Sequence, residues 1–359
     1  MIGGKTSSHD PSRMSQLDGL RAIAVAGVVY AHWMPPKYGF NIPFAELGVL
    51  LFFVLSGYLI SGIIFDRREG KFDFLRKFYI RRAIRIFPPY YLTVGVLIYL
   101  DVLKPPSQAI YHLAYISNIY LFFGNEWKPF AGHFWSLAVE EQFYLVWPAL
   151  ILFLSRATLL HVIWSVIAFS LISKLVVAIF FPETRLFHVL PVVAFDGMAA
   201  GGILAYAERS TGLRDVLMRW CFRIGMPILS ICLLLRLWGI NAPLLAMALD
   251  MAALAAFTAL VGGAARGFTG VTGKVLGNNI LVYIGTISYG IYIYHAYPVY
   301  VIKSILVWCE LPLEWRFGIS GLLMQAALTL LVASLSWHLL EFPIGKLKRY
   351  FPYGPSAFR

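Results

Sequence analysis

The chain has 359 residues, of which 59% are hydrophobic and only 13% are charged, and its mean hydropathy is +0.72. This composition excludes a soluble globular enzyme and indicates a membrane protein with several spanning helices. The formal net charge is +12, but the basic residues flank apolar stretches, where they set topology, so we expect no nucleic-acid partner. The three cysteines have neither paired nor metal-ligand spacing, and we expect no metal site.

About ten apolar stretches are long enough to cross a bilayer as helices. They lie at residues 17–34, 44–65, 87–103, 133–154, 160–181, 190–207, 224–240, 242–262, 279–302 and 314–340. When the short, polar segment 109–123 is kept out of this set, most of the 30 Lys and Arg residues fall on the cytoplasmic side, as the positive-inside bias requires. Residues 104–132 then form an outer, partly re-entrant segment.

The predicted fold class is therefore an all-α polytopic membrane protein, a bundle of about ten transmembrane helices with both termini cytoplasmic. We expect a single integral-membrane domain over residues 1–345 and a basic cytoplasmic tail over residues 346–359. A bacterial inner membrane is the expected location.

The first predicted span carries Arg21 near its start and His32 near its end. Their spacing corresponds to about three helical turns, so both side chains lie on one face, roughly 16 Å apart along the axis. A charged group at mid-bilayer costs about 2.5 to 3.5 kcal/mol, so such groups usually face the bundle or a wet cavity. A juxtamembrane anchor with an interfacial histidine is the alternative interpretation.

A basic amphipathic segment, residues 66–86, follows the second span, and Pro88 and Pro89 are expected to close it before the third. Arg85 follows Arg82 by three residues and Arg81 by four, which places the three guanidinium groups on one side of a helix at the cytoplasmic surface. Because like charges repel, an anionic ligand is expected there. Lipid headgroups are one candidate. A phosphate-rich ligand is the other, because arginine donates two hydrogen bonds to phosphate at once.

The fourth predicted span contains two adjacent carboxylates, Glu140 and Glu141. One of them paired with a Lys or Arg of another span would be a purely structural arrangement, but intramembrane carboxylates are functional candidates by default. The helix runs inward and the carboxylates begin about 10 Å from its outer end. A glutamate can therefore meet His32 in the outer half of the bundle, as the orienting partner of a general base.

The ninth predicted span places His295 in its outer half with several tyrosines, including Tyr294. A histidine among tyrosines commonly belongs to an interfacial aromatic belt. Its possible convergence with His32 and Glu140 makes it a candidate for an acceptor-side or supporting role, together with Tyr294 and Trp135. Near the cytoplasmic end of the last span, His338 and Glu341 are expected to stabilise the helix end.

These stretches together resemble the acyltransferase-3 family of membrane-bound O-acyltransferases. The matching segments are "LDGLRAIAV…H" (17–32), "LFFVLSGYLI" (51–60), "RRAIRIFPPY" (81–90), "FWSLAVEEQFYLVWP" (134–148), "ISYGIYIYHAYP" (287–298) and "EFP" (341–343). They follow one another in order over nearly the whole chain. The chain ends soon after its last span and so resembles the stand-alone members rather than those fused to a hydrolase-like domain.

Family patterns fall on specific positions of this sequence. The Arg-x10-His, Arg-x-x-Arg and Ser-Leu-x-x-Glu patterns fall on Arg21 and His32, on Arg82 and Arg85, and on Ser136 to Glu140. Leu50 departs from the Asp of "GVDLFF"-type versions, which weakens the case for a functional role of the second span.

The resemblance implies transfer of an acyl group, commonly acetyl, from a cytoplasmic acyl-CoA such as acetyl-CoA to a hydroxyl of a saccharide or glycolipid. Exopolysaccharide and lipopolysaccharide are examples of such acceptors. Arg82 and Arg85, with Arg81, would hold the donor's phosphates, and the donor's arm would run along the face that carries Arg21.

Two chemical routes fit the implied reaction. In the first, His32 removes the proton of the acceptor hydroxyl while Glu140 or Glu141 holds the imidazole in the useful tautomer. In the second, a transient acyl-histidine carries the acyl group. The rival interpretations of the chain are a proton-coupled transporter, which would use the same buried His, Glu and Arg groups, and a subunit of a synthesis complex without chemistry of its own.

Overall fold

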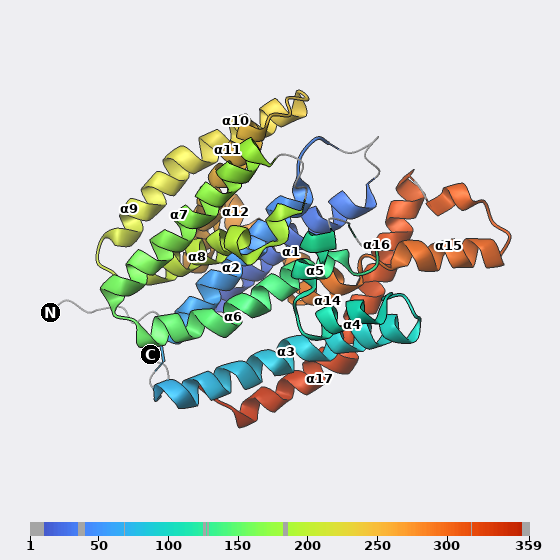
Figure 1. Ribbon diagram of the computed structural model, residues 1–359, viewed down its shortest axis with the longest axis horizontal. Coiled ribbons are helices and arrows are strands. Elements are labelled where there is room, and N and C mark those ends of the chain that lie inside the picture. Colours follow the sequence, from blue (N-terminus) through green and yellow to red (C-terminus); the bar gives the residue numbers. More distant parts are fainter. Residues whose placement is uncertain are drawn as a thin grey trace.

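The computed structural model describes residues 11–34, 40–67, 69–124, 127, 129–181, 186–316 and 318–353. Within these ranges the chain is helical, with turns and no strand (Figure 1). Six helical stretches are long and apolar enough to cross a membrane. They are Phe44–Phe65, Gly132–Phe153, Arg156–Phe180, Leu213–Leu237, Pro243–Arg266 and Gly318–Tyr350. The protein is thus an all-helical, multi-pass membrane protein, and the count of about ten spans stays a prediction.

The first half of the chain supplies the centre of the bundle. Its helices are α1 (Pro11–Trp33), α2 (Phe44–Phe65), α3 (Lys71–Tyr99), α4 (Pro106–Leu113), α5 (Ser117–Gly124), α6 (Trp135–Phe153), α7 (Arg156–Phe180) and α8 (Pro191–Ala207). The short turns η1 (Gly132–Phe134) and η2 (Phe187–Val189) precede α6 and α8. α2 packs against α1, α6 and α8, and α6 lies between α2 and α3 (Figure 1).

The second half surrounds this centre. Its helices are α9 (Leu213–Trp220), α10 (Met226–Leu237), α11 (Pro243–Arg266), α12 (Gly270–Leu276), α13 (Asn279–Thr286), α14 (Ser288–Tyr294), α15 (Pro298–Trp308), α16 (Gly318–Ser336) and α17 (Phe342–Gly345). The π-helical turns η3 (Cys221–Gly225) and η5 (Trp337–Glu341) join α9 to α10 and α16 to α17. The 3-10 turns η4 (Leu313–Arg316) and η6 (Lys346–Tyr350) precede α16 and follow α17.

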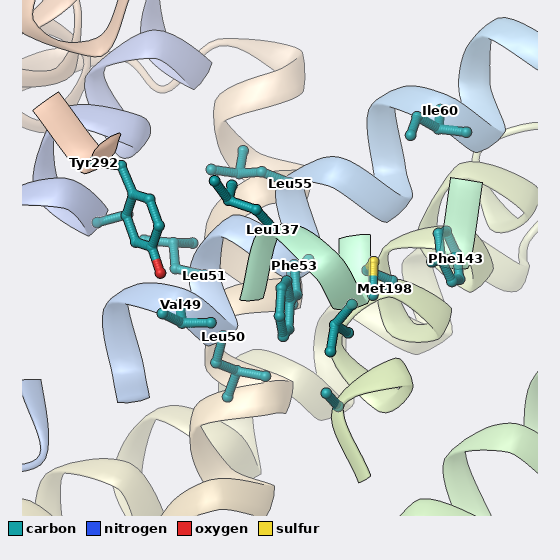
Figure 2. Packing of buried hydrophobic residues seen from close by; sticks show 14 of the residues in the cluster. Val49, Leu50, Leu51, Phe53, Leu55, Ile60, Leu137, Phe143, Met198 and Tyr292 are labelled. Atoms are coloured by element: carbon teal, nitrogen blue, oxygen red, sulfur yellow. The ribbon is translucent and has the colours of Figure 1, made fainter. Parts of the chain in front are cut away.

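The contact between α2 and α8 depends on glycine. A Cβ atom added at Gly57 would lie 1.9 Å from the carbonyl oxygen of Met198, and one at Gly201 would lie 2.1 Å from that of Val54. Backbone can approach this closely only without side chains, as in other membrane helix pairs. Figure 2 shows part of the resulting packing, with Phe53 of α2 among buried side chains that include Met198 of α8.

α3 differs from the sequence expectation. Pro88 and Pro89 do not end the basic segment, because one helix runs from Lys71 to Tyr99 with both prolines inside it. The missing N–H groups of the two prolines leave the carbonyls of Ile84 and Arg85 without their helical donors. The Tyr289 hydroxyl donates to the next carbonyl along the helix, that of Ile86, at 2.8 Å. The helix is about 43 Å long. Its two central arginines, residues 82 and 85, therefore lie about 16 to 21 Å from its start, near the middle of the helix.

The predicted ninth span, residues 279–302, is three helices rather than one. α13, α14 and α15 are separated by Ile287 and by residues 295–297. Pro298 occupies the first turn of α15, where its missing N–H costs nothing, and this explains the second interruption. His295 stands at that interruption, and its carbonyl accepts a hydrogen bond of 2.8 Å from Trp33 Nε1. The break therefore brings His295 to the end of α1.

Candidate active site

A cavity of about 240 Å³ lies among α1, α2, α3, α6 and α14, and we call it the arginine cavity. Its polar lining consists of Arg21, Ser56, Arg82, Arg85, Ser136, Glu140, Glu141, Tyr144, Ser288, Tyr289 and Tyr292. Apolar side chains of α2 complete the wall, among them Val49 and Phe53. The structure thus brings together three of the four arginines and both carboxylates that the sequence singled out.

Arg82 and Arg85 have donors left for a ligand. Neither makes a hydrogen bond or a salt bridge with any residue that the structure describes. The Arg82 guanidinium lies over the ring of Tyr144, 4.4 Å from its centroid, and this contact orients the group without using its N–H donors. Two guanidinium groups with free donors in a partly buried cavity indicate an anionic ligand that accepts in pairs, such as phosphate.

Arg21 and Arg81 have different tasks. Arg21 lines the arginine cavity and is paired with Asp18 of the preceding turn at 2.5 Å. Arg81 donates to the carbonyl oxygens of Lys348 and Phe351, at 2.9 and 3.1 Å, and is not among the lining residues. Arg81 therefore holds the C-terminal segment against α3, and the structure separates it from the other three arginines.

A neighbouring cavity of about 440 Å³, the lysine cavity, lies beside Asp18 and Arg21 in the first half of α1. Its lining includes Lys346 and Lys348, and it shares Arg21, Arg85 and Tyr289 with the arginine cavity. Arg21 and Arg85 therefore stand at the junction of two adjoining spaces. A long, thin ligand with anionic groups along it fits this arrangement better than a compact one.

Glu140 and Glu141 face the arginines. The positive charges of Arg82 and Arg85 act on Glu140, and the Oε1 atom of Glu141 is buried without a hydrogen bond among the described residues. Their negative charges offset repulsion between the guanidinium groups. The structure does not show the expected pairing of one of these carboxylates with His32. The Nδ1 atom of His32 instead contacts the Val28 carbonyl oxygen and His295 Nε2.

The tautomer of His32 follows from its acceptors. His32 Nδ1 lies 2.9 Å from the carbonyl oxygen of Val28, and a carbonyl can only accept, so Nδ1 carries the hydrogen of the neutral ring. His295 Nδ1 likewise donates to the carbonyl of Tyr292 at 2.7 Å, which leaves His295 Nε2 as an acceptor, 3.2 Å from His32 Nδ1. The unprotonated nitrogen of His32 is therefore Nε2, the atom that a general base or a nucleophile needs.

His32 and the arginine cavity lie on two sides of Tyr292. The Tyr292 hydroxyl donates to the carbonyl of His133 at 2.8 Å and accepts from Ser136 Oγ at 2.6 Å, at the cavity wall. The carbonyl of the same residue accepts from His295. His32 itself is exposed at the end of α1, with its ring stacked on that of Trp127 at 6.3 Å, and does not line the cavity.

The remaining candidate residues, His295, Tyr294 and Trp135, also lie outside the lining of the arginine cavity. His295 is fully buried and packs edge-on against His133, with ring centroids 4.9 Å apart. Tyr294 bonds to Ser336 of α16 and lines neither of the two cavities described above. Trp135 lines a different cavity, on the other side of Phe53. His133 has no role among the sequence-based predictions, although it directly precedes the motif that contains Ser136.

No group of three or more His, Cys, Asp or Glu side chains in the described ranges is arranged to hold a metal ion. The arrangement is instead suited to acid–base or nucleophilic chemistry at an imidazole, next to a dock for an anionic ligand.

Comparison with known proteins identifies the family. Residues 14–341 match the family model described as an acyltransferase domain, so the chain belongs to the acyltransferase-3 family. The peptidoglycan O-acetyltransferase OatA of Listeria monocytogenes is 30% identical over 373 residues, which cover 95% of this chain and 57% of the relative. The O-acetyltransferase OatA of Staphylococcus aureus is 29% identical over 394 residues, which cover 94% of this chain and 58% of the relative. This chain thus spans less than two thirds of the length of these relatives. No solved structure matches it significantly.

Proposed function

We propose that the protein is a membrane O-acyltransferase that moves an acyl group, most simply acetyl, from a cytoplasmic acyl-CoA to a hydroxyl of a saccharide or glycolipid acceptor. The family and the names of the two relatives support acyl transfer. The single observation that carries the proposal is the pairing of an unprotonated His32 Nε2 with a nearby cavity that has two free guanidinium groups. The proposal includes about ten spans, both termini in the cytoplasm and a bacterial inner membrane.

The donor would enter where α1 begins. In this proposal the nucleotide end of acyl-CoA occupies the lysine cavity, and its pyrophosphate meets Arg85 and Arg82 at the junction with the arginine cavity. The narrow pantetheine arm then follows the arginine cavity toward Ser136 and Tyr292 in its wall. A long donor explains why two adjoining spaces, rather than one, contain the cationic groups.

The acceptor chemistry is assigned to His32. Its Nε2 takes the proton of the acceptor hydroxyl, the hydroxyl oxygen attacks the thioester carbonyl, and the carbon–sulfur bond breaks. The sulfur leaves as coenzyme A thiol once it has received the proton, and the acceptor keeps the new ester. An acyl-histidine route uses the same nitrogen as nucleophile and delivers the acyl group in two steps. In both routes the acyl group passes the Ser136–Tyr292 pair to reach the imidazole.

The test is an assay of the purified protein in nanodiscs with radiolabelled acetyl-CoA and a panel of glycans that includes peptidoglycan fragments. We expect label in a glycan ester, and we expect the glycan of cells that lack the gene to lose one acyl group by mass spectrometry. Solute uptake without acetyl-CoA binding would favour a proton-coupled transporter instead. Full glycan acylation in cells that carry His32→Ala would favour a subunit without chemistry of its own.

A further inference from the structure

A second large cavity, of about 490 Å³, lies at the opposite end of the bundle from the lysine cavity. The lysine cavity adjoins Asp18 and Arg21, near the start of α1, whereas this one is lined by the first turns of α2, α6 and α11 and by the last turns of α7 and α10. α1 and α10 end at that side of the bundle, and α2 and α11 begin there after short connections. We call it the aspartate cavity, after Asp196 and Asp250 in its wall.

Its charged groups are arranged so that one carboxylate oxygen remains available. Lys174 donates to Asp196 at 2.7 Å and to Asp250 at 2.5 Å. Asp196 is buried, and its other oxygen accepts from the backbone N–H of Gly197 at 2.8 Å. Asp250 is 34% exposed, and its Oδ1 makes no hydrogen bond within the described part of the chain. Lys174 therefore fixes Asp250 and leaves it one acceptor oxygen at the cavity.

Aromatic side chains form another part of the wall. Trp135 meets Phe53 edge-to-face, with ring centroids 6.2 Å apart, and meets His188 in the same way at 5.3 Å. All three line the cavity, and Phe181 lies at its rim. An apolar surface with a few fixed hydrogen-bonding groups is the usual construction of a small-molecule site. Aromatic side chains and a carboxylate acceptor in the same wall suit a sugar ring, which has an apolar face and hydroxyl donors at its edge.

The net charge of the lining restricts the chemical class of the ligand further. Three carboxylates, those of Glu46, Asp196 and Asp250, face two cations, Lys174 and Arg236. The excess of negative charge disfavours a phosphate- or carboxylate-bearing group at this position. The arginine cavity has the opposite preference. The two cavities are therefore chemically distinct, one suited to an anion and the other to a neutral polyol.

The aspartate cavity also lies next to the proposed chemistry. Val49 and Phe53 line both it and the arginine cavity, so in places a single layer of α2 side chains separates the two. Glu46, in the first turn of α2, lines the aspartate cavity and is close enough to His32 to act on it electrostatically. The cavity thus approaches the exposed imidazole from the side away from the lysine cavity.

We propose that the aspartate cavity binds the acceptor, as an uncharged, hydroxyl-rich sugar ring that stacks on Trp135 and donates a hydrogen bond to Asp250. This inference rests on the acyl transfer proposed above and adds the location and charge of the acceptor.

The experiment uses the full chain and a steric plug. Ala178 lines the aspartate cavity from α7, so Ala178→Trp fills it, whereas Ala168→Trp adds the same bulk on an exposed face of the same helix. Cells that lack the gene are complemented with each variant, and O-acyl groups on their glycan are measured by mass spectrometry. Acetyl-CoA binding to each purified protein is measured separately.

We expect Ala178→Trp to lower glycan acylation about tenfold or more while its acetyl-CoA affinity stays within about twofold of the wild type, and we expect Ala168→Trp to change neither. If Ala178→Trp does not fold, Asp250→Asn tests the proposal in its place. It keeps the shape of the side chain but weakens a charge-assisted hydrogen bond, and we expect a loss of acylation of about tenfold.

Wild-type acylation by both Ala178→Trp and Asp250→Asn would overturn the proposal. So would an acyl group found on a phosphate-bearing sugar. Failure of the proposed function gives a different result, because the wild-type protein would then neither bind acetyl-CoA nor change the glycan.

Discussion

His295 Nε2 lies 3.2 Å from His32 Nδ1, and this contact joins the interruption after α14 to the end of α1. Because His295 donates its own hydrogen to the Tyr292 carbonyl, its Nε2 can only accept in the neutral ring. The contact therefore favours the same tautomer of His32 as the Val28 carbonyl does, which leaves the Nε2 atom free for chemistry. It is the kind of orienting partner that catalytic histidines require, supplied here by an imidazole rather than by a carboxylate.

A first prediction concerns His295 as a positioning residue. His295→Ala is expected to lower kcat about 10- to 1000-fold and to leave acetyl-CoA affinity unchanged, because His32 loses the acceptor that orients it from another helix and keeps only the Val28 carbonyl of its own helix. His295→Gln, whose amide oxygen can accept the same hydrogen, is expected to recover part of the rate. His161→Ala is a matched control, since that histidine is exposed on α7 and bonds only within its own helix. Equal rates in the Ala and Gln variants would argue against positioning through the hydrogen bond.

A second prediction separates the arginines. Arg82→Ala or Arg85→Ala is expected to weaken acetyl-CoA binding about 10- to 100-fold, which corresponds to about 1.5 to 3 kcal/mol for charge-assisted hydrogen bonds to phosphate. Arg81→Ala is expected to leave that affinity within about threefold, because Arg81 holds the C-terminal segment instead. Isothermal titration with acetyl-CoA measures all three. A loss as large in Arg81→Ala as in the other two would contradict the assignment.

A third prediction distinguishes two roles for the carboxylates. If Glu141 oriented His32, Glu141→Gln would lower the rate by orders of magnitude. The structure instead places it beside the arginines, so removal of its charge is expected to leave kcat within about tenfold and to leave acetyl-CoA affinity equal or higher, because a charge that repels phosphate is lost. Single-turnover rates and donor affinities decide between these roles. Tight donor binding with a rate near zero would restore the catalytic role.

A fourth prediction concerns the contact between α2 and α8. Gly201→Ala places a Cβ atom 2.1 Å from the Val54 carbonyl oxygen, so the two helices must separate, at an expected cost of about 1 to 3 kcal/mol. Gly95→Ala is the control, because nothing lies within 4 Å of its added Cβ atom in α3 and the substitution favours the helix by about 0.5 to 1 kcal/mol. Thermal unfolding in detergent is expected to show a lower Tm for the first variant only. A Tm unchanged in Gly201→Ala would mean that the helices pack less closely than described.

The sequence predicted the helical class and much of the arginine cavity, because both depend on local signals. Apolar length identifies spans, and an ionisable side chain inside an apolar helix stands out without any knowledge of its neighbours. Arg21 stands out in this way, Arg82 and Arg85 stand out by their spacing in a basic amphipathic segment, and the structure brings all three to one cavity. The comparisons confirm the family to which these motifs pointed.

What the sequence could not predict depends on partners from distant segments. Pro88 and Pro89 were expected to end a helix, but α3 continues through both of them and packs against α6 and α14, which come from distant parts of the chain. The same long helix brings Arg82 and Arg85 to one cavity with Glu140. His295 replaces the glutamates as the partner of His32 because the interruption before Pro298 turns it toward α1, and no local pattern encodes that meeting.

The central claim is that donor binding and acyl transfer reside in different groups, the arginines of the cavity and the imidazole of His32. The most direct measurement is made on the His32→Ala protein, by titration with acetyl-CoA and by single-turnover transfer to glycan. The account predicts acetyl-CoA affinity close to that of the wild type with no acyl transfer above background. Transfer by His32→Ala at the wild-type rate would contradict it.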